Sequence, residues 1–189
     1  MSASLSPSRR AWQAFKQHRR GYVSLCLFAC LFALSLAAPL WSNDKPLWVS
    51  YQGQHYFPLW QEHHETVFGG DFETPTDYLD PYIRHNITHN GNSALYLPNP
   101  YAANTLNDFD TEPNPAAPNE RHWLGTDDRG RDVLARLVYG FRDSVLFALA
   151  LTAVATVVGI FFGAVQGYFG GKTDLLLQRF MEVWGGLPE

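Results

Sequence analysis

The stretch "SVLFALALTAVATVVGIFFGAVQGYF", residues 144–169, decides the fold class of this chain of 189 residues. It contains no Asp, Glu, Lys or Arg, and the uncharged run continues to residue 171. A helix of about 20 apolar residues spans the hydrocarbon core of a bilayer. The sequence therefore predicts a transmembrane helix over residues 144–169.

Small residues recur at a regular spacing within this helix. Ala155, Gly159, Gly163 and Gly167 are four positions apart, so they lie along one helix face. Small side chains allow the backbones of membrane helices to approach closely. We expect these residues to form a ridge that packs against other helices, although glycine is also generally enriched in membrane helices.

A second uncharged run lies near the start of the chain. It covers residues 21–43, and we predict a transmembrane helix over residues 21–41. Residues 1–20 carry five Lys or Arg and no acid, which favours a cytoplasmic start under the positive-inside rule. The alternative is a cleaved signal peptide, since Ser35 and Ala37 are small residues at positions that a signal peptidase reads. The length of the run favours an uncleaved anchor.

Residues 42–121 form a polar stretch between the two runs, with eleven acids against Lys45, Arg84 and Arg121. It opens with short aromatic β-like runs around Gly53, in "LWVSYQGQHYFPLW". Its helical periodicity is weak and its apolar residues are scattered. We predict an irregular extracytoplasmic insert with a thin core. Its histidines lack a third ligand at a recognisable spacing, so we predict no metal site.

The stretch "HWLGTDDRGRDVLARLVYG", residues 122–140, joins the insert to the second predicted span. Glycines mark turns, acids are suited to cap the following helix, and arginines can pair with the acids. We expect Thr126, Asp127 and Asp128 to provide the cap, and Arg129 and Arg131 to form the pairs. Residues 122–143 are thus predicted as a polar collar followed by an interfacial helix. A surface helix packed on the insert fits the pattern equally well. The collar residues are Gly125, Thr126, Asp127, Asp128, Gly130, Arg131, Asp132 and Arg136.

Glycines end the second predicted span. We expect residues 170–174, with Gly170, Gly171 and Lys172, to form a cytoplasmic turn. Residues 175–189 then predict the start of a third transmembrane helix, which is truncated at "GGLPE". A nucleotide-binding P-loop is excluded, because position 166 is Gln166 where that motif needs glycine and the preceding segment is a helix.

The sequence contains no pattern typical of catalysis. Its two cysteines, Cys26 and Cys30, lie in the first predicted span and are interpreted as small apolar helix residues. No nucleophile and base occur at a recognisable spacing. We therefore predict no catalytic residue and no cofactor in this chain. The basic start precedes an apolar span, so it favours orientation in a membrane over binding of nucleic acid.

Residues 124–188 resemble the inner-membrane permease subunits of ABC peptide importers, in the dipeptide and oligopeptide C-type family. The resemblance is carried by an LGTD-x-x-GRD-like run at residues 124–132, by Arg136 and Gly140, and by a GYYGG-like turn at residues 167–171. The stretch "FGGDFETPTDYLDPYI", residues 68–83, further resembles the permease subgroup that includes the microcin C importer.

The resemblance implies an all-α membrane protein of the ABC importer permease type. Two complete transmembrane helices and the start of a third would flank the irregular insert. It also implies a multi-pass subunit of the bacterial inner membrane that carries peptides and does not itself hydrolyse ATP. The implied partners are a second permease subunit, two ATPase subunits, a periplasmic peptide-binding protein and membrane lipid. The family's EAA–Gly loop, which docks the ATPase, does not occur within these 189 residues.

A function from another class remains as the alternative. The chain would then be a membrane-anchored sensor or binding module, with residues 43–121 as its extracytoplasmic ligand domain. This alternative explains the insert, but it leaves the ridge of small residues and the glycine turn without a role.

Overall fold

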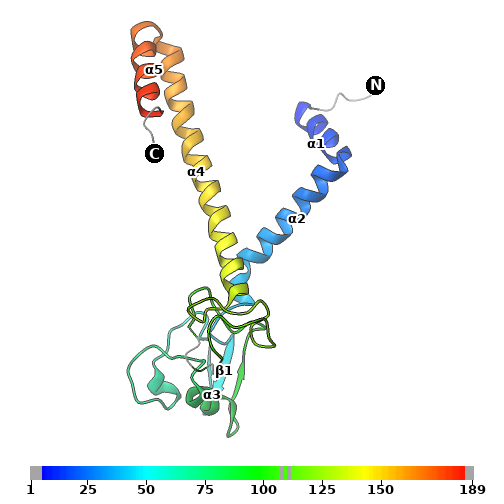
Figure 1. Cartoon of the computed structure of the whole chain (residues 1–189), viewed down its shortest axis with the longest axis vertical. Helices are drawn as coiled ribbons and strands as arrows, with labels where there is room; N and C mark the ends of the chain where they lie inside the picture. The colour runs from blue at the N-terminus through cyan, green and yellow to red at the C-terminus, as the bar shows by residue number, and fades with distance from the viewer. Residues whose placement is uncertain (1–5, 107–108, 110–111, 186–189) are drawn as a thin grey trace. The chain divides into compact units, whose positions relative to one another are not determined.

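The structure of the chain is a computed structural model that describes residues 6–106, 109 and 112–185. It comprises two compact units, Met1–Asp143 and Ser144–Glu189. The first unit contains three complete α-helices, a small sheet and the start of a long helix, and the second contains the remainder of that helix and a shorter one (Figure 1).

Helices α1 (Pro7–Gln17) and α2 (Arg19–Leu36) are separated by His18, whose ψ of 80° breaks the helical path. A single 3₁₀ turn, η1 (Ala38–Leu40), follows α2 and contains Pro39. Helix α4 (Val133–Phe169) is the longest element, with 37 residues. By length and composition, α2 and α4 are the two helices in the described residues that could cross a membrane. Both overlap the spans predicted from the sequence.

Residues 42–132, here called the lobe, hold a three-stranded antiparallel sheet in the order β2-β1-β3. Strand β1 (Trp48–Tyr51) pairs with β2 (Gln54–Tyr56) and with β3 (Ser93–Leu95). In the register, Val49 lies opposite Tyr56 on one side and Ala94 on the other. The lobe also contains a 3₁₀ turn, η2 (Glu65–Phe68), and helix α3 (Pro81–Thr88).

The lobe has a core of its own between the sheet and α3. Val49, Phe68, Tyr78, Ile83 and Ile87 are buried together there. Ile83 and Ile87 are four residues apart, so they share the inner face of α3. This short helix begins with two strong start signals, a proline at its first position and the Asp80 carboxylate, which accepts a hydrogen bond from the Tyr82 N–H at 2.7 Å.

The fold class is therefore helix-rich, with two long apolar helices, but it is not all-α. The short β-like runs that the sequence predicted around Gly53 correspond to β1 and β2, but the prediction of an irregular insert did not anticipate β3 and α3 of the lobe. Strand β3 has only three residues, which is too short for alternation of apolar and polar residues to be recognised. Residues 85–88 of the segment "HNITHNG" belong to α3.

Two predicted boundaries also differ from the structure. The interfacial helix and the second span form one continuous helix, α4, because residues 133–169 contain no proline and a hydrogen-bonded helix need not stop where polarity changes. The turn after it is shorter than residues 170–174, since α5 (Gly171–Gly185) begins directly after Gly170. Lys172 therefore lies in the first turn of α5. The end of the predicted third span, residues 186–189, lies outside the described residues.

We predict that Phe68→Ala destabilises the lobe by about 3–5 kcal/mol, because it removes a fully buried ring and leaves a cavity in the core. Urea unfolding in detergent, followed by near-ultraviolet circular dichroism, measures the loss. Phe72→Ala is the matched control, since its side chain is 66% exposed and its loss should change stability by no more than about 0.5 kcal/mol. Equal effects of the two substitutions would contradict the proposed core.

Candidate functional site: a buried polar network

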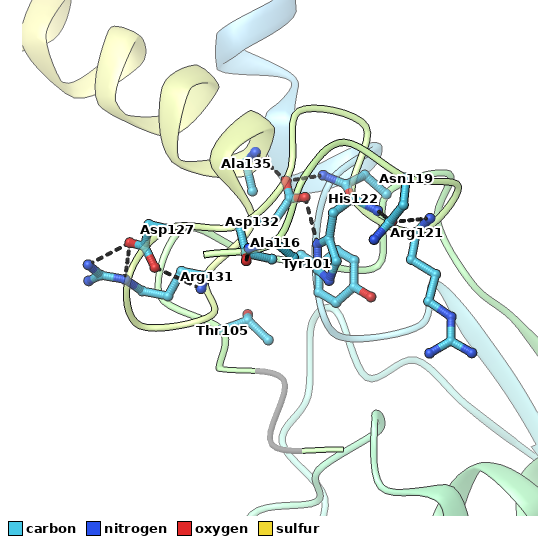
Figure 2. A network of polar contacts seen from close by, with 12 residues as sticks. Tyr101, Thr105, Ala116, Asn119, Arg121, His122, Asp127, Arg131, Asp132 and Ala135 are labelled. Atoms are coloured by element: carbon cyan, nitrogen blue, oxygen red, sulfur yellow. Dashed lines mark hydrogen bonds and ion pairs between the residues drawn. The ribbon is translucent and has the colours of Figure 1, made fainter. Parts of the chain in front are cut away.

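Asp132 begins α4 and is the centre of a buried polar network (Figure 2). Asp132 is 1% exposed to solvent. The carboxylate accepts hydrogen bonds from the Ala135 N–H at 2.7 Å and from the Asn99 amide at 3.2 Å. Its second oxygen lies 3.0 Å from His122 Nδ1. Because a carboxylate can only accept, His122 donates its Nδ1 proton to Asp132.

Ser42 extends this network to the segment that follows α2. Its hydroxyl donates to the Tyr101 carbonyl at 2.8 Å and accepts from the Asn99 amide at 3.0 Å. The Ser42 carbonyl accepts from the Tyr139 hydroxyl of α4 at 2.8 Å. Backbone hydrogen bonds join the same segments, from Asn43 N–H to the Asn99 carbonyl and from Asn99 N–H to the Trp41 carbonyl. The end of α2, the lobe and the start of α4 are thus tied together within one unit.

A small apolar cluster lies beside the network. Leu79, Tyr101 and Ala135 are buried together, and the Tyr101 ring stacks on His122 with ring centroids 4.4 Å apart. Ala135 is fully buried in the first turn of α4. The stacking and the hydrogen bond to Asp132 together fix the His122 side chain on two sides.

Ser42, His122 and Asp132 are residue types used in nucleophilic catalysis, but their arrangement does not suit it. The single proton of the Ser42 hydroxyl is directed to a backbone carbonyl. All three residues are buried, so a substrate could not reach the hydroxyl. The arrangement holds segments of backbone in place and assigns no covalent chemistry to these side chains.

A second cluster surrounds Asp127, in the loop before α4. The Asp127 carboxylate accepts from the backbone N–H groups of Arg129 and Arg131, each at 2.9 Å. Both Arg131 Nε, at 2.9 Å, and Arg131 Nη2, at 2.8 Å, donate to its other oxygen, which Arg136 Nη1 also contacts. One carboxylate therefore receives two backbone and three side-chain donors and shapes the whole loop (Figure 2).

These donors determine the charge state of Asp127. Removal of the carboxylate from water would by itself raise its pKa. The hydrogen bonds from the backbone and side chain of Arg131 and from the backbone of Arg129 outweigh that effect, and they hold the pKa well below the usual value of 3.8. Asp127 is therefore ionised at every physiological pH.

Two glycines permit the close fit of this loop against residues 114–118. Gly125 has φ +76°, and an added Cβ would lie 2.4 Å from the Ala116 carbonyl oxygen. Gly130 has φ +78°, and an added Cβ would lie 2.6 Å from the Asn114 amide nitrogen. Between them, the Thr126 hydroxyl accepts from the Ala116 N–H at 2.8 Å. A side chain at position 125 would have to displace the backbone of residues 116–118, and one at position 130 would have to displace the Asn114 side chain.

The structure brings together most, but not all, of the collar residues predicted from the sequence. Thr126, Asp127 and Asp128 do not cap α4; Asp132 does, because its carboxylate is the one in reach of the Ala135 N–H. Arg131 and Arg136 pair with Asp127. Arg129 contributes its backbone N–H, and in the described part of the chain no ion pair of Arg129 or Asp128 is found.

The other predicted site residues lie in the second unit. A Cβ added at Gly159, Gly163 or Gly167 would meet nothing within 4 Å, and Ala155 is exposed. The ridge is therefore free of contacts in this structure, and its packing against other helices stays a prediction. Gly170 and Gly171 both have positive φ and form the reversal between α4 and α5.

Sequence reasoning missed Ser42, Asn99, Tyr101 and His122 as members of the network. Asp132 was predicted as a collar residue but not as the cap, although an aspartate directly before the first apolar residue of a helix is a typical N-cap. Among the described residues, no group of three or more His, Cys, Asp or Glu is arranged to hold a metal ion. His85 and His89 stack on each other, with ring centroids 4.1 Å apart.

We predict that Asp132→Ala destabilises the first unit by about 2–5 kcal/mol, because it removes the helix cap and leaves buried donors of Asn99 and His122 without their acceptor. Urea unfolding measures the loss. Asp128→Ala, the same substitution at an exposed position of the same loop, should cost no more than about 0.5 kcal/mol. A cost for Asp132→Ala as small as that of the control would contradict the network.

We also predict a pH-dependent effect of Asp127→Asn. A carboxylate whose pKa is lowered on folding binds fewer protons in the folded state, so its contribution is present above the unfolded pKa of about 3.9 and is lost as pH falls toward the folded pKa. The stability difference between the wild type and Asp127→Asn should therefore be largest near about pH 7 and shrink at about pH 3. Urea unfolding at both pH values tests it. Asp128→Asn is the control, and a difference for Asp127→Asn that does not change with pH would refute the assignment.

Residues 6–57 match the family model described as the N-terminal TM domain of oligopeptide transport permease C. This match covers α1, α2 and the first two strands, so it is independent of the collar residues. No solved structure matches the chain.

Three curated relatives are similar to the chain. The inner membrane ABC transporter permease protein YejE of Escherichia coli is 48% identical over 185 residues, which are 97% of this chain and 54% of the relative. The peptidoglycan transport system permease protein YejE of Agrobacterium fabrum is 43% identical, over 96% of this chain and 53% of the relative. The oligopeptide transport system permease protein OppC of Haemophilus influenzae is 41% identical, over 44% of this chain and 28% of the relative.

The chain spans about half the length of the two YejE relatives. The family model and the relatives agree with each other, and the similarity includes the spans, the lobe and the collar. Over almost its whole length the chain is similar to permease proteins named for ABC or peptidoglycan transport, and over shorter stretches to permeases of oligopeptide transport.

Proposed function

We propose that this chain acts within a permease subunit of an ATP-driven ABC importer, which moves peptides or peptide-like compounds across the bacterial inner membrane. In the proposed topology residues 1–20 are cytoplasmic, α2 and α4 cross the membrane, and the lobe lies on the extracytoplasmic side. The basic residues before α2 support this orientation. The acids of the collar offset arginines that the topology places outside, as in the pairs of Asp127 with Arg131 and Arg136.

The observation that carries the proposal is the buried network around Asp132. It attaches the lobe directly to the end of α2 and to the start of α4, through Ser42, Asn99 and Tyr139. A sensor domain that moves freely on its anchor needs a flexible linker. A lobe hydrogen-bonded to both candidate spans instead suits a rigid platform at the outer mouth of a permease.

The remaining parts of such an importer would come from partners. We assign no covalent chemistry and no cofactor to this chain, so ATP would be hydrolysed by two separate ATPase subunits. A second permease subunit would complete the pore, and a periplasmic peptide-binding protein would deliver the cargo. The exposed small residues of α4 are suited to contact other transmembrane helices, because a helix can approach their backbone closely.

A pair of substitutions on α4 tests this assignment. We predict that Ala155→Leu lowers peptide uptake at least roughly tenfold, since a bulky side chain on the ridge would hold the neighbouring helix away. The measurement is uptake of radiolabelled trialanine by cells in which the native gene for this chain is deleted and replaced by the wild-type or the variant gene. The ATPase activity that co-purifies with the tagged chain provides a second readout, which should fall in parallel.

Ala150→Leu is the matched control. It makes the same change five residues earlier, on the other side of the helix from the ridge. Its uptake and co-purifying ATPase activity should stay near the wild-type values. Equal losses of peptide uptake in Ala155→Leu and Ala150→Leu would contradict the proposed role of the ridge in helix packing. Unchanged peptide uptake after deletion of the chain, with no co-purifying ATPase, would contradict the importer function and favour the sensor or binding module.

A further inference from the structure

Helix α1 has two chemically different faces. At 3.6 residues per turn, Arg9, Gln13 and Lys16 follow one another along one side, with Arg10 and Gln17 next to them. The opposite side presents Ser8, Ala11, Trp12 and Phe15. No apolar residue interrupts the charged side, and no charged residue interrupts the apolar side. This division is typical of a helix that lies in the plane of a membrane interface.

The apolar face is not buried by the protein. Trp12 is 49% exposed, and α1 has no fully buried residue. The Trp12 ring stacks on Phe15, with centroids 5.7 Å apart, and Phe15 meets the edge of Tyr22 in α2 at 6.5 Å. These rings form a continuous aromatic surface from α1 to the beginning of α2. Tryptophan and tyrosine are the side chains enriched where the hydrocarbon of a bilayer meets its headgroups.

The position of α1 in the chain determines which surface it can meet. α1 ends at Gln17, and α2, which is a candidate membrane span, begins at Arg19. One intervening residue, His18, cannot carry α1 away from the bilayer that α2 enters. The first acid of the sequence is Asp44, beyond α2, so the charge of residues 1–43 is wholly positive. Lys16 lies over the Trp12 ring, 5.4 Å from its centroid, at the border between the two faces.

We propose that α1 is an anionic-lipid binding element, which lies in the membrane interface with Trp12 and Phe15 among the upper acyl chains. Arg9, Arg10 and Lys16, together with Arg19 and Arg20 at the start of α2, bind lipid phosphates there. Guanidinium groups hydrogen-bond phosphate oxygens in a bidentate manner, and basic side chains beside a membrane span attract anionic headgroups. The inference requires α2 to lie in a bilayer, but it does not require the chain to transport peptide.

Quenching of Trp12 by brominated lipids tests the proposal. The full chain is reconstituted into vesicles of phosphatidylcholine and phosphatidylglycerol in equal amounts, with bromine on the acyl chains of one lipid or of the other. The Trp12 contribution is the difference between the chain and its Trp12→Phe variant. Both brominated lipids should quench Trp12, and brominated phosphatidylglycerol should do so about threefold more strongly. In about 1 M salt, where screening shortens the range of charge interactions, the ratio should approach one.

A charge-neutral variant separates the lipid contact from the depth of the helix. In Arg9→Gln/Arg10→Gln/Lys16→Gln the quenching should persist, while the preference for phosphatidylglycerol falls to at most about half. Gln13→Ala/Gln17→Ala alters the same face without changing its charge, so the wild-type ratio should be kept. Three results would each overturn the proposal: no quenching of Trp12 by either lipid, equal quenching by both lipids in the wild type, or an unchanged ratio in the charge-neutral variant. A ratio in the wild-type chain that stays unchanged in about 1 M salt would also overturn the proposal, and this measurement does not depend on the folding of the variant.

Discussion

A buried carboxylate must receive hydrogen bonds, because no water is present to provide them. At Asp132 this requirement is met by donors from three separate segments, Ala135 of α4, Asn99 of the lobe and His122 of the collar. Each donor reaches the carboxylate only if its backbone is in the correct place. Within the first unit, the position of the start of α4 relative to the lobe therefore depends on the hydrogen bonds that the Asp132 carboxylate accepts.

The collar holds a second carboxylate in a different environment. Asp127 is partly accessible, and exposed ion pairs such as its contact with Arg136 contribute little to stability by themselves. Its importance lies in the two backbone N–H groups that it accepts, since these define the path of the loop from residue 127 to residue 131. The collar thus combines the buried Asp132, which fixes neighbouring segments, with the partly exposed Asp127, which shapes a loop.

The sequence predicted those parts of the fold that have a long or repeated pattern. Residues 144–169 are uncharged over more than the thickness of a bilayer, so a long apolar helix was predictable. Short β-like runs around Gly53 indicated β1 and β2, but the core of the lobe was not predictable, because it unites positions as distant as Val49 and Ile87. For the same reason, no local pattern marks Ser42 and Asn99 as buried partners, since 57 residues separate them. Asp132 lies beside the helix that it caps, where local rules apply.

The two tight glycines of the collar restrict how the sequence of this region can diverge. Gly53 and Gly91 also have positive φ, but open space surrounds them, so asparagine or aspartate could replace either with little strain. At Gly125 both the backbone conformation and the neighbouring backbone atoms exclude a side chain, whereas at Gly130 the nearest atoms belong to the Asn114 side chain. Random mutagenesis would therefore leave Gly53 and Gly91 variable and Gly125 fixed, even though these glycines all lie in turns of the same lobe.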